Sequence, residues 1–213
     1  MTVPAWLRPL AEAARDVRAE ELSRFTPPAE GARRDSAVLV LLGEGPLGPD
    51  VLLIERAATL RQHAGQPAFP GGVLDAGETP VQAALREAQE EVGLDPAGVR
   101  VLAVLPALFI PFSGYAVTPV LGWWETPGEV SAVDAAEVAA VVRVPLAELF
   151  APAARVQVRH PSGWVGPAFE VRDLLVWGFT AGLLTRLLEL GGLDPGPPAD
   201  PPLRALPPLA VSS

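Results

Sequence analysis

Three glutamates near the middle of the chain, Glu87, Glu90 and Glu91, are spaced three and four residues apart. On a helix this spacing places their carboxylates on one side, where neighbouring like charges repel by ~0.2–0.5 kcal/mol per pair. The helix dipole disfavours them further near the C-terminal end. A divalent cation removes both penalties, because Mg²⁺ prefers oxygen ligands and completes its shell with water and substrate phosphates. The alternative is a solvated acidic helix face without a metal.

The helix that carries these glutamates is well marked over residues 79–92. Thr79 is a good N-cap, Pro80 suits the first helical position, and Gln82 completes a capping box. Gly93 is a natural stop signal. The apolar positions follow helical spacing and predict a stripe that faces the core. They are Val81, Ala84, Leu85, Ala88 and Val92.

A wider pattern surrounds the helix, with the form Gly-x5-Glu-x7-Arg-Glu-U-x-Glu-Glu-x-Gly-U, where U is aliphatic. Its fixed positions are Gly72, Glu78, Arg86, Glu87, Glu90, Glu91 and Gly93. Ala88 is small for its aliphatic position. Residues 72–94 therefore resemble the Nudix box, the sequence motif of the Nudix hydrolases.

This resemblance implies an α/β fold, the Nudix α/β/α sandwich with a mixed sheet. It implies hydrolysis of a nucleoside diphosphate linked to another group, with Mg²⁺ or Mn²⁺ as cofactor. Glu87, Glu90 and Glu91 take the positions of the metal-binding glutamates, and Glu90 and Glu91 are also counted as catalytic. Glu78 is an accessory carboxylate, and Gly71 is expected to add a backbone oxygen to the metal site.

Arg86 is included among the catalytic residues because it can reach Glu90 at i+4 and orient a carboxylate. The superfamily often uses a further carboxylate outside the box as a base. Glu137, just before an expected strand, is our candidate; Glu125 and Glu129 are alternatives, and a plain surface role for Glu137 stays open.

The loop before the box bears on the substrate. It contains Arg61-x3-Gly65-x3-Phe69-Pro-Gly-Gly, which resembles the signature of Nudix coenzyme A diphosphatases, although Ile54 and Arg56 stand where that signature tends to have hydroxyl residues. Further similarity to this subfamily extends over about residues 36–190. The resemblance implies cleavage of coenzyme A or its derivatives to 3′,5′-ADP and 4′-phosphopantetheine.

Four side chains are candidates for substrate binding. Arg61, and after it Arg56, are expected to bind phosphate, since a guanidinium fork matches phosphate oxygens. Phe69 or Tyr115 can stack on adenine. The alternatives are a loop arginine paired with a carboxylate and an aromatic ring packed in the core. His63 and His160 are given no catalytic role.

Two other readings of function stay open. One is a Nudix hydrolase acting on NADH, ADP-ribose, a nucleotide sugar or a dNTP, which the signature loop would distinguish. The other is a non-enzymatic Nudix-fold binding module; such proteins usually lose box carboxylates, and here all are present.

Apolar patterning and turn residues predict the remaining elements. We expect residues 1–30 to be an N-terminal helical extension, 31–192 the Nudix domain, and 193–213 a Pro-rich flexible tail unable to form helix or sheet. The expected helices cover 6–22, 79–92, 145–150 and 176–190. The expected strands cover 37–42, 51–55, 101–111, 116–124, 138–144, 155–159 and 169–172, with a loop at 56–70.

Composition limits the partners. The 213 residues carry a net charge of −9, which argues against nucleic-acid binding. There is no cysteine, which excludes disulfides and thiol nucleophiles, and all 16 basic residues are arginine. No signal peptide or membrane span is apparent, so we expect a cytoplasmic, bacterial protein with a small-molecule substrate. A homodimer is left open.

Overall fold

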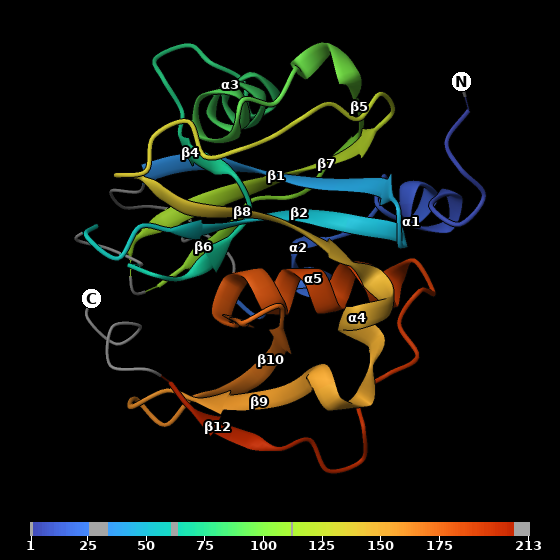
Figure 1. Ribbon diagram of the computed structural model, residues 1–213, viewed down its shortest axis with the longest axis vertical. Helices are drawn as coiled ribbons and strands as arrows, with labels where there is room; N and C mark the ends of the chain where they lie inside the picture. The colour runs from blue at the N-terminus through green and yellow to red at the C-terminus, as the bar shows by residue number, and fades with distance from the viewer. Residues whose placement is uncertain (1, 26–33, 61–63, 112, 207–213) are drawn as a thin grey trace.

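Three layers form the main body of the molecule (Figure 1). The computed structural model describes residues 2–25, 34–60, 64–111 and 113–206. A large mixed sheet lies between helix α3 (Pro80–Val92) on one face and α5 (Gly178–Leu190) on the other, with α1, α2 and α4 on the α5 side. This arrangement confirms the expected α/β/α sandwich. Within the described residues, no helix has the length and apolar character needed to cross a membrane.

The large sheet is built around β1 (Arg34–Gly45). β1 forms an antiparallel hairpin with β2 (Gly48–Arg56), as the turn signals between them predict, and pairs in parallel with β7 (Tyr115–Trp124). The strand order is β3-β2-β1-β7-β5, with β4 paired to β1, β6 to β7 and β8 to β2. The other members are β3 (Pro67–Ala68), β4 (Gly71–Val73), β5 (Val99–Val104), β6 (Leu108–Ile110) and β8 (Val138–Pro145).

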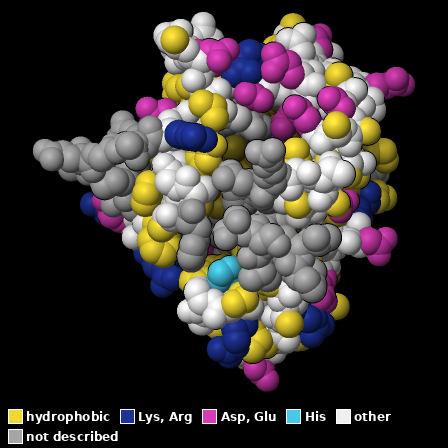
Figure 2. Space-filling model, turned by 90° about the vertical axis from the view of Figure 1, so that its left-hand side faces the viewer, with side chains coloured by type: hydrophobic (Ala, Val, Ile, Leu, Met, Phe, Trp, Pro, Cys, Tyr) yellow, Lys and Arg dark blue, Asp and Glu magenta, His cyan; other side chains and the backbone are white. Residues whose placement is uncertain are grey.

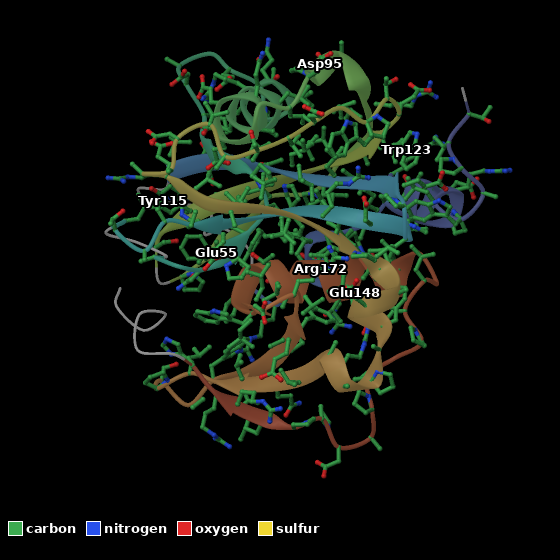
Figure 3. All side chains as sticks on the ribbon, viewed as in Figure 1. Glu55, Asp95, Tyr115, Trp123, Glu148 and Arg172 are labelled. Carbon is green, nitrogen blue, oxygen red and sulfur yellow. The ribbon has the colours of Figure 1, made fainter. Side chains whose placement is uncertain are left out.

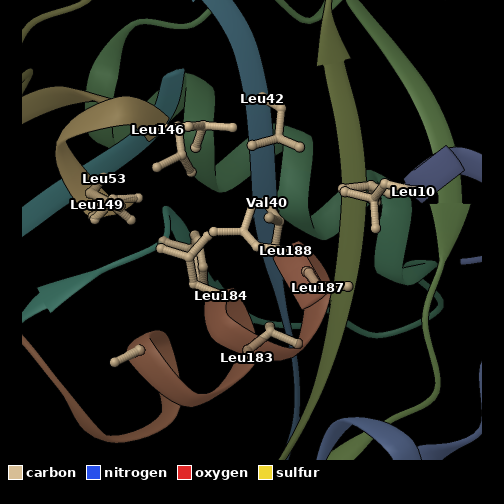
Figure 4. Close-up of a cluster of buried hydrophobic side chains, with 14 of the residues drawn as sticks. Leu10, Val40, Leu42, Leu53, Leu146, Leu149, Leu183, Leu184, Leu187 and Leu188 are labelled. Carbon is tan, nitrogen blue, oxygen red and sulfur yellow. The ribbon is translucent and has the colours of Figure 1, made fainter. Parts of the chain in front are cut away.

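The side chains of β1 alternate between two hydrophobic cores, one on each face of the large sheet. Leu39 and Leu41 lie in the core on the α3 side, whereas Val40 and Leu42 lie in the core on the α5 side, where Figure 4 shows Val40 beside Leu184 and Leu42 beside Leu146. Side chains on a strand point alternately to the two faces, so a one-residue slip would reverse both sets. Full burial of each such side chain contributes about 1.5–3 kcal/mol. The position of β1 between the helices is therefore strongly specified.

A second sheet lies beyond α5, in the order β11-β10-β9-β12. One strand of this sheet comes from the Pro-rich tail: residues 203–205 form β12, which pairs in parallel with β9. The prediction that this tail forms no sheet is wrong there: the strand itself, Leu-Arg-Ala, has no proline, and Pro202 still accepts a hydrogen bond from Gln157 through its carbonyl. The strands are β9 (Arg155–Arg159), β10 (Val165–Val171), β11 (Leu174–Val176) and β12 (Leu203–Ala205).

Three predicted elements are divided or shortened. The helix expected at 6–22 is two short helices, and its Trp6 instead packs edge-on against Trp123 and donates to Glu44. The strand expected at 101–111 breaks into β5 and β6 around Pro106, which has no N–H to donate. The helix expected from 176 begins at Gly178, because the preceding residues pair with β10. The remaining elements are α1 (Arg8–Ala13), α2 (Ala19–Leu22), α4 (Leu146–Phe150) and the 3₁₀ turns Pro96–Gly98 and Pro152–Ala154.

Candidate active site

Helix α3 begins and ends where its sequence predicts. The Thr79 hydroxyl accepts a hydrogen bond from the Gln82 N–H at 3.3 Å, and the Gln82 side chain accepts one from the Thr79 N–H at 2.9 Å. Gly93 ends the helix with a left-handed φ of 68°. The capping box and the glycine stop are therefore confirmed, and they fix the two ends of the helix that carries the glutamates.

Glu91 is the buried carboxylate of the cluster, with 6 % of its surface exposed. It accepts a hydrogen bond from the Gly71 N–H at 3.0 Å, and its other oxygen lies 3.7 Å from Arg56 Nη1. Burial raises the pKa of Glu91 to about 7, although the hydrogen bond from Gly71 and the charge of Arg56 both lower it. The charges of Glu87 and Glu137 raise that pKa further, so both carboxylates lie near Glu91.

Glu87 packs against the backbone of Gly72. A Cβ atom at Gly72 would clash with the Glu87 carboxylate, so the box glycine leaves space for it. Burial raises the pKa of Glu87, and the adjacent Arg86 opposes that rise. The glycine and the glutamate of the motif are thus parts of one packing arrangement.

Arg86 lies in the middle of the acidic group. Its guanidinium donates to Glu78 at 3.0 and 3.1 Å, to Glu87 at 2.9 Å and to Glu90 at 3.0 Å. It also donates to the Val73 carbonyl at 3.1 Å. These hydrogen bonds hold the pKa of Glu78 below its ordinary value. Arg86 therefore connects the loop before the helix to the carboxylates on it.

As placed, the carboxylates do not form a ready metal shell. In the part of the chain that the structure describes, no group of three or more His, Asp or Glu side chains is arranged to hold a metal ion. Arg86 acts as the counterion of Glu87 and Glu90, and the Glu90 side chain is 60 % exposed. The donor chemistry still fits a divalent cation, because all donors are oxygens, the buried Glu91 and the partly buried Glu87 have raised pKa values, and Gly72 leaves space beside Glu87.

Glu137 is the base candidate that the structure brings to this cluster. Its carbonyl accepts from the Ala57 N–H at 2.8 Å, which places it at the end of β2. Glu125 instead follows the last residue of β7, beyond the far end of the sheet, and pairs with Arg100 at 2.7 Å. Glu129 is exposed. Of the three alternatives, only Glu137 acts electrostatically on Glu87 and Glu91.

Arg56 reaches Glu91 through an irregularity of its strand. A register shift between Glu55 and Arg56 interrupts the pairing of β2 with β8, and such bulges re-aim side chains beside active sites. The Arg56 backbone then bonds with Gln66 and Gly65 at 3.1 and 3.0 Å. The signature loop thus folds back onto Arg56 and holds it beside the acidic helix.

The other residues predicted to bind substrate are Arg61, Phe69 and Tyr115, and the structure bears on each of them differently. Arg61 and His63 lie outside the described residues. Phe69 is 3 % exposed and packs in the core with α5, so the prediction that it stacks on a base is wrong: its side chain falls on the inner face of the sheet. Tyr115 is partly exposed and accepts a hydrogen bond from Arg34 at 3.4 Å.

Arg34 and Thr180 contact residues of the candidate site but were not themselves predicted from the sequence. Arg34 precedes the first expected strand and belongs to no motif, so no sequence signal selects it. Thr180 donates from a buried hydroxyl to the Pro67 carbonyl at 3.2 Å, which ties α5 to the signature loop. Its stretch, residues 176–181, does resemble the coenzyme A subfamily and could have directed attention to it.

The site occupies one end of the large sheet. Figure 3 places Tyr115 and Glu55 at this end of the sheet. Figure 2 views the same end, and acidic side chains gather in the upper part of that face. Negative charge next to buried carboxylates requires cations for any anionic substrate to approach.

Comparisons with known proteins agree with this geometry. A model of the NUDIX domain matches residues 32–162. A protein named "uncharacterized Nudix hydrolase NudL" from Cronobacter sakazakii is 42 % identical over 171 residues, covering 75 % of this chain and 84 % of its own length. A protein of the same name from Citrobacter koseri is 40 % identical over 185 residues, covering 80 % and 93 %.

Solved structures show the same fold. A Nudix hydrolase from M. smegmatis, RenU, superposes with a TM-score of 0.51 at 26 % identity, covering 76 % of this chain and 89 % of its own. A NUDIX hydrolase from Nitrosomonas europaea also gives a TM-score of 0.51, at 16 % identity, over 83 % of this chain and 79 % of its own. This second likeness concerns the fold alone.

Proposed function

The chain belongs to the Nudix hydrolase family, and from that premise we propose that the diphosphate bond it cleaves is that of coenzyme A or its derivatives, giving 3′,5′-ADP and 4′-phosphopantetheine. Family membership makes the protein a hydrolase of nucleoside diphosphate derivatives. The finer assignment rests on one observation: the loop that resembles the coenzyme A diphosphatase signature holds Arg56 against Glu91. In this proposal, the substrate-binding Arg56 therefore lies directly beside a glutamate of the acidic helix.

The proposed cofactor is Mg²⁺ or Mn²⁺, held by Glu87, Glu90 and Glu91, with Glu78 and the Gly71 backbone as accessory groups. When bound, the cation neutralises phosphoryl charge and lowers the pKa of a coordinated water. Because Arg86 contacts Glu87 and Glu90, its role in the proposal is to keep both carboxylates in place while they bind the cation.

The remaining side chains act on the substrate directly. In the proposal, Arg56 donates to the diphosphate oxygens, and Arg61 adds a further phosphate contact. Glu137 accepts the proton of the attacking water as the new phosphorus–oxygen bond forms. The bridging phosphorus–oxygen bond then breaks, and the departing phosphate takes up a proton from solvent.

A substrate panel tests the reaction. Coenzyme A, acetyl coenzyme A, NADH, ADP-ribose and dNTPs are assayed side by side with Mg²⁺ and with Mn²⁺, and products are separated by chromatography. We expect the highest kcat/KM for coenzyme A or its acyl form. A clear preference for a substrate without pantetheine would replace this proposal with a general nucleotide hydrolase, and no turnover at all would favour the binding module.

Variants test the carboxylates. Glu90→Gln and Glu91→Gln remove one charge each and should reduce kcat by at least ~100-fold, as expected for groups that hold a catalytic metal. Glu20→Gln, an exposed glutamate on α2, is the matched control and should keep full activity. Retained turnover in both Glu90→Gln and Glu91→Gln shows that the ligand assignment is wrong.

A further inference from the structure

Arg34 and Tyr115 are cross-strand neighbours at the start of β1 and β7. Their Cα atoms are partners in the parallel pairing of these strands. Arg34 Nη1 donates to the Tyr115 hydroxyl at 3.4 Å, and the guanidinium carbon lies 5.9 Å from the centre of the ring. The pair thus combines a cation and an aromatic ring on one short stretch of the sheet edge.

The pair lies at the same end of the sheet as the acidic cluster (Figures 1 and 3). Ala37 on β1 is paired with Gly72, against which the Glu87 carboxylate packs. Arg34 precedes Ala37 by three residues, which is about 10 Å of strand at ~3.4 Å per residue, and the alternation of side chains along β1 points Arg34 toward the α5 face, across the end of the sheet from Glu87. A nucleoside is of this length, so one whose 5′-phosphate lies at the acidic cluster can reach Arg34 by passing around the end of the sheet, where β1 and β7 begin.

The charge of Arg34 is available to a ligand. Its side chain is exposed, and no carboxylate among the described residues lies within ion-pair distance of it, whereas Arg56 and Arg86 both face glutamates. A guanidinium fork matches the oxygens of a phosphate, and an exposed aromatic face stacks on a base. An arginine beside an aromatic ring therefore fits a nucleotide that carries a phosphate additional to its diphosphate.

We infer that Arg34 and Tyr115 form the subsite for the adenosine end of the substrate, with Arg34 binding the 3′-phosphate and Tyr115 stacking on adenine. The inference rests on the proposed function, since it names the part of coenzyme A that this subsite distinguishes. Arg34 then makes the protein prefer coenzyme A to 3′-dephospho-coenzyme A, NADH and ADP-ribose, which lack that phosphate.

Steady-state kinetics test Arg34. In Arg34→Gln, kcat/KM for coenzyme A falls about 10- to 100-fold, mainly through KM, because one charge-assisted contact is lost. For 3′-dephospho-coenzyme A, kcat/KM stays within about twofold. Arg15→Gln, an exposed arginine at the end of α1, is the control and leaves both substrates unchanged. If Arg34→Gln lowers both substrates equally, or neither, the assignment of the 3′-phosphate is overturned.

Tyr115 is tested with a pair of variants. Tyr115→Leu removes the ring and raises KM for both substrates, since both carry adenine, and it does so to a greater extent than Tyr115→Phe, which keeps the ring and loses only the hydroxyl contact with Arg34. Equal behaviour of the two variants overturns the stacking role. Thermal unfolding of each variant shows whether a loss comes from the fold instead.

Binding without turnover separates this subsite from the proposed reaction. Calorimetry with 3′,5′-ADP and 5′-AMP, on wild type and Arg34→Gln, measures the 3′-phosphate contribution directly. Tighter binding of 3′,5′-ADP that depends on Arg34, in a protein that does not cleave coenzyme A, refutes the reaction alone. Cleavage of coenzyme A with no such dependence refutes the subsite alone.

Discussion

Replacement of Glu91 by glutamine should stabilise the metal-free protein at alkaline pH and change little at pH 5. Glutamine keeps the shape of the side chain and can still accept from the Gly71 N–H, but it removes the buried charge. The pKa of Glu91 is raised from 4.5 to about 7, mainly by burial. A raised pKa means that the ionised carboxylate destabilises the fold.

The magnitude follows from linkage between protonation and folding. The stability that Glu91 contributes is fully present below pH 4.5, its unfolded value, and is lost as pH rises through 7. At ~1.4 kcal/mol for each pKa unit, the wild type should lose about 2–3 kcal/mol relative to Glu91→Gln between pH 5 and pH 8.5. Groups that do not interact with Glu91 titrate equally in both proteins, so the difference reports on Glu91 together with the charges coupled to it.

The assay is urea unfolding in EDTA at both pH values, followed by intrinsic tryptophan fluorescence. Glu90→Gln is the matched control on the same helix; its side chain is 60 % exposed, so the change should stay within about 0.5 kcal/mol at either pH. A stability difference between wild type and Glu91→Gln that is the same at pH 5 and pH 8.5 would refute the account of Glu91 as a buried, destabilising charge.

Three further substitutions test other parts of the structure. Gly72→Ala should displace the Glu87 carboxylate and weaken Mn²⁺ binding by ~10-fold or more in calorimetry, since outer contacts of metal ligands matter at that scale; unchanged affinity would contradict the packing argument. Asp194→Asn leaves the buried Arg155 unpaired at its 2.6 Å ion pair and should cost about 3–5 kcal/mol in urea unfolding; a loss below 1 kcal/mol would show that water reaches the pair. Thr79→Ala removes the N-cap of α3 and should cost about 1 kcal/mol, measured in the same way, with Thr79→Ser as the control that retains the cap.

Local signals made the acidic helix predictable. Thr79, Gln82 and Gly93 act on residues within one turn, so their effect follows from sequence spacing alone. The position of Phe69 did not follow in this way, because the direction of its ring depends on β3 and α5, far apart in the chain. The pairing of Arg34 with Tyr115 joins residues 81 positions apart, and β12 depends on contact with β9. Such long-range pairings carry no local pattern.

The hydrogen bond from Thr180 to Pro67 has a consequence for how specificity can evolve. The family domain match ends at residue 162, whereas α5 and its Thr180 lie beyond it. The matched portion of the chain thus contains the acidic helix, while α5, outside that match, is tied through Thr180 to the loop before the Nudix box. Substitutions in α5 can therefore move this loop without touching any carboxylate of the acidic helix, so the support of the loop can change in evolution while the acidic helix stays intact.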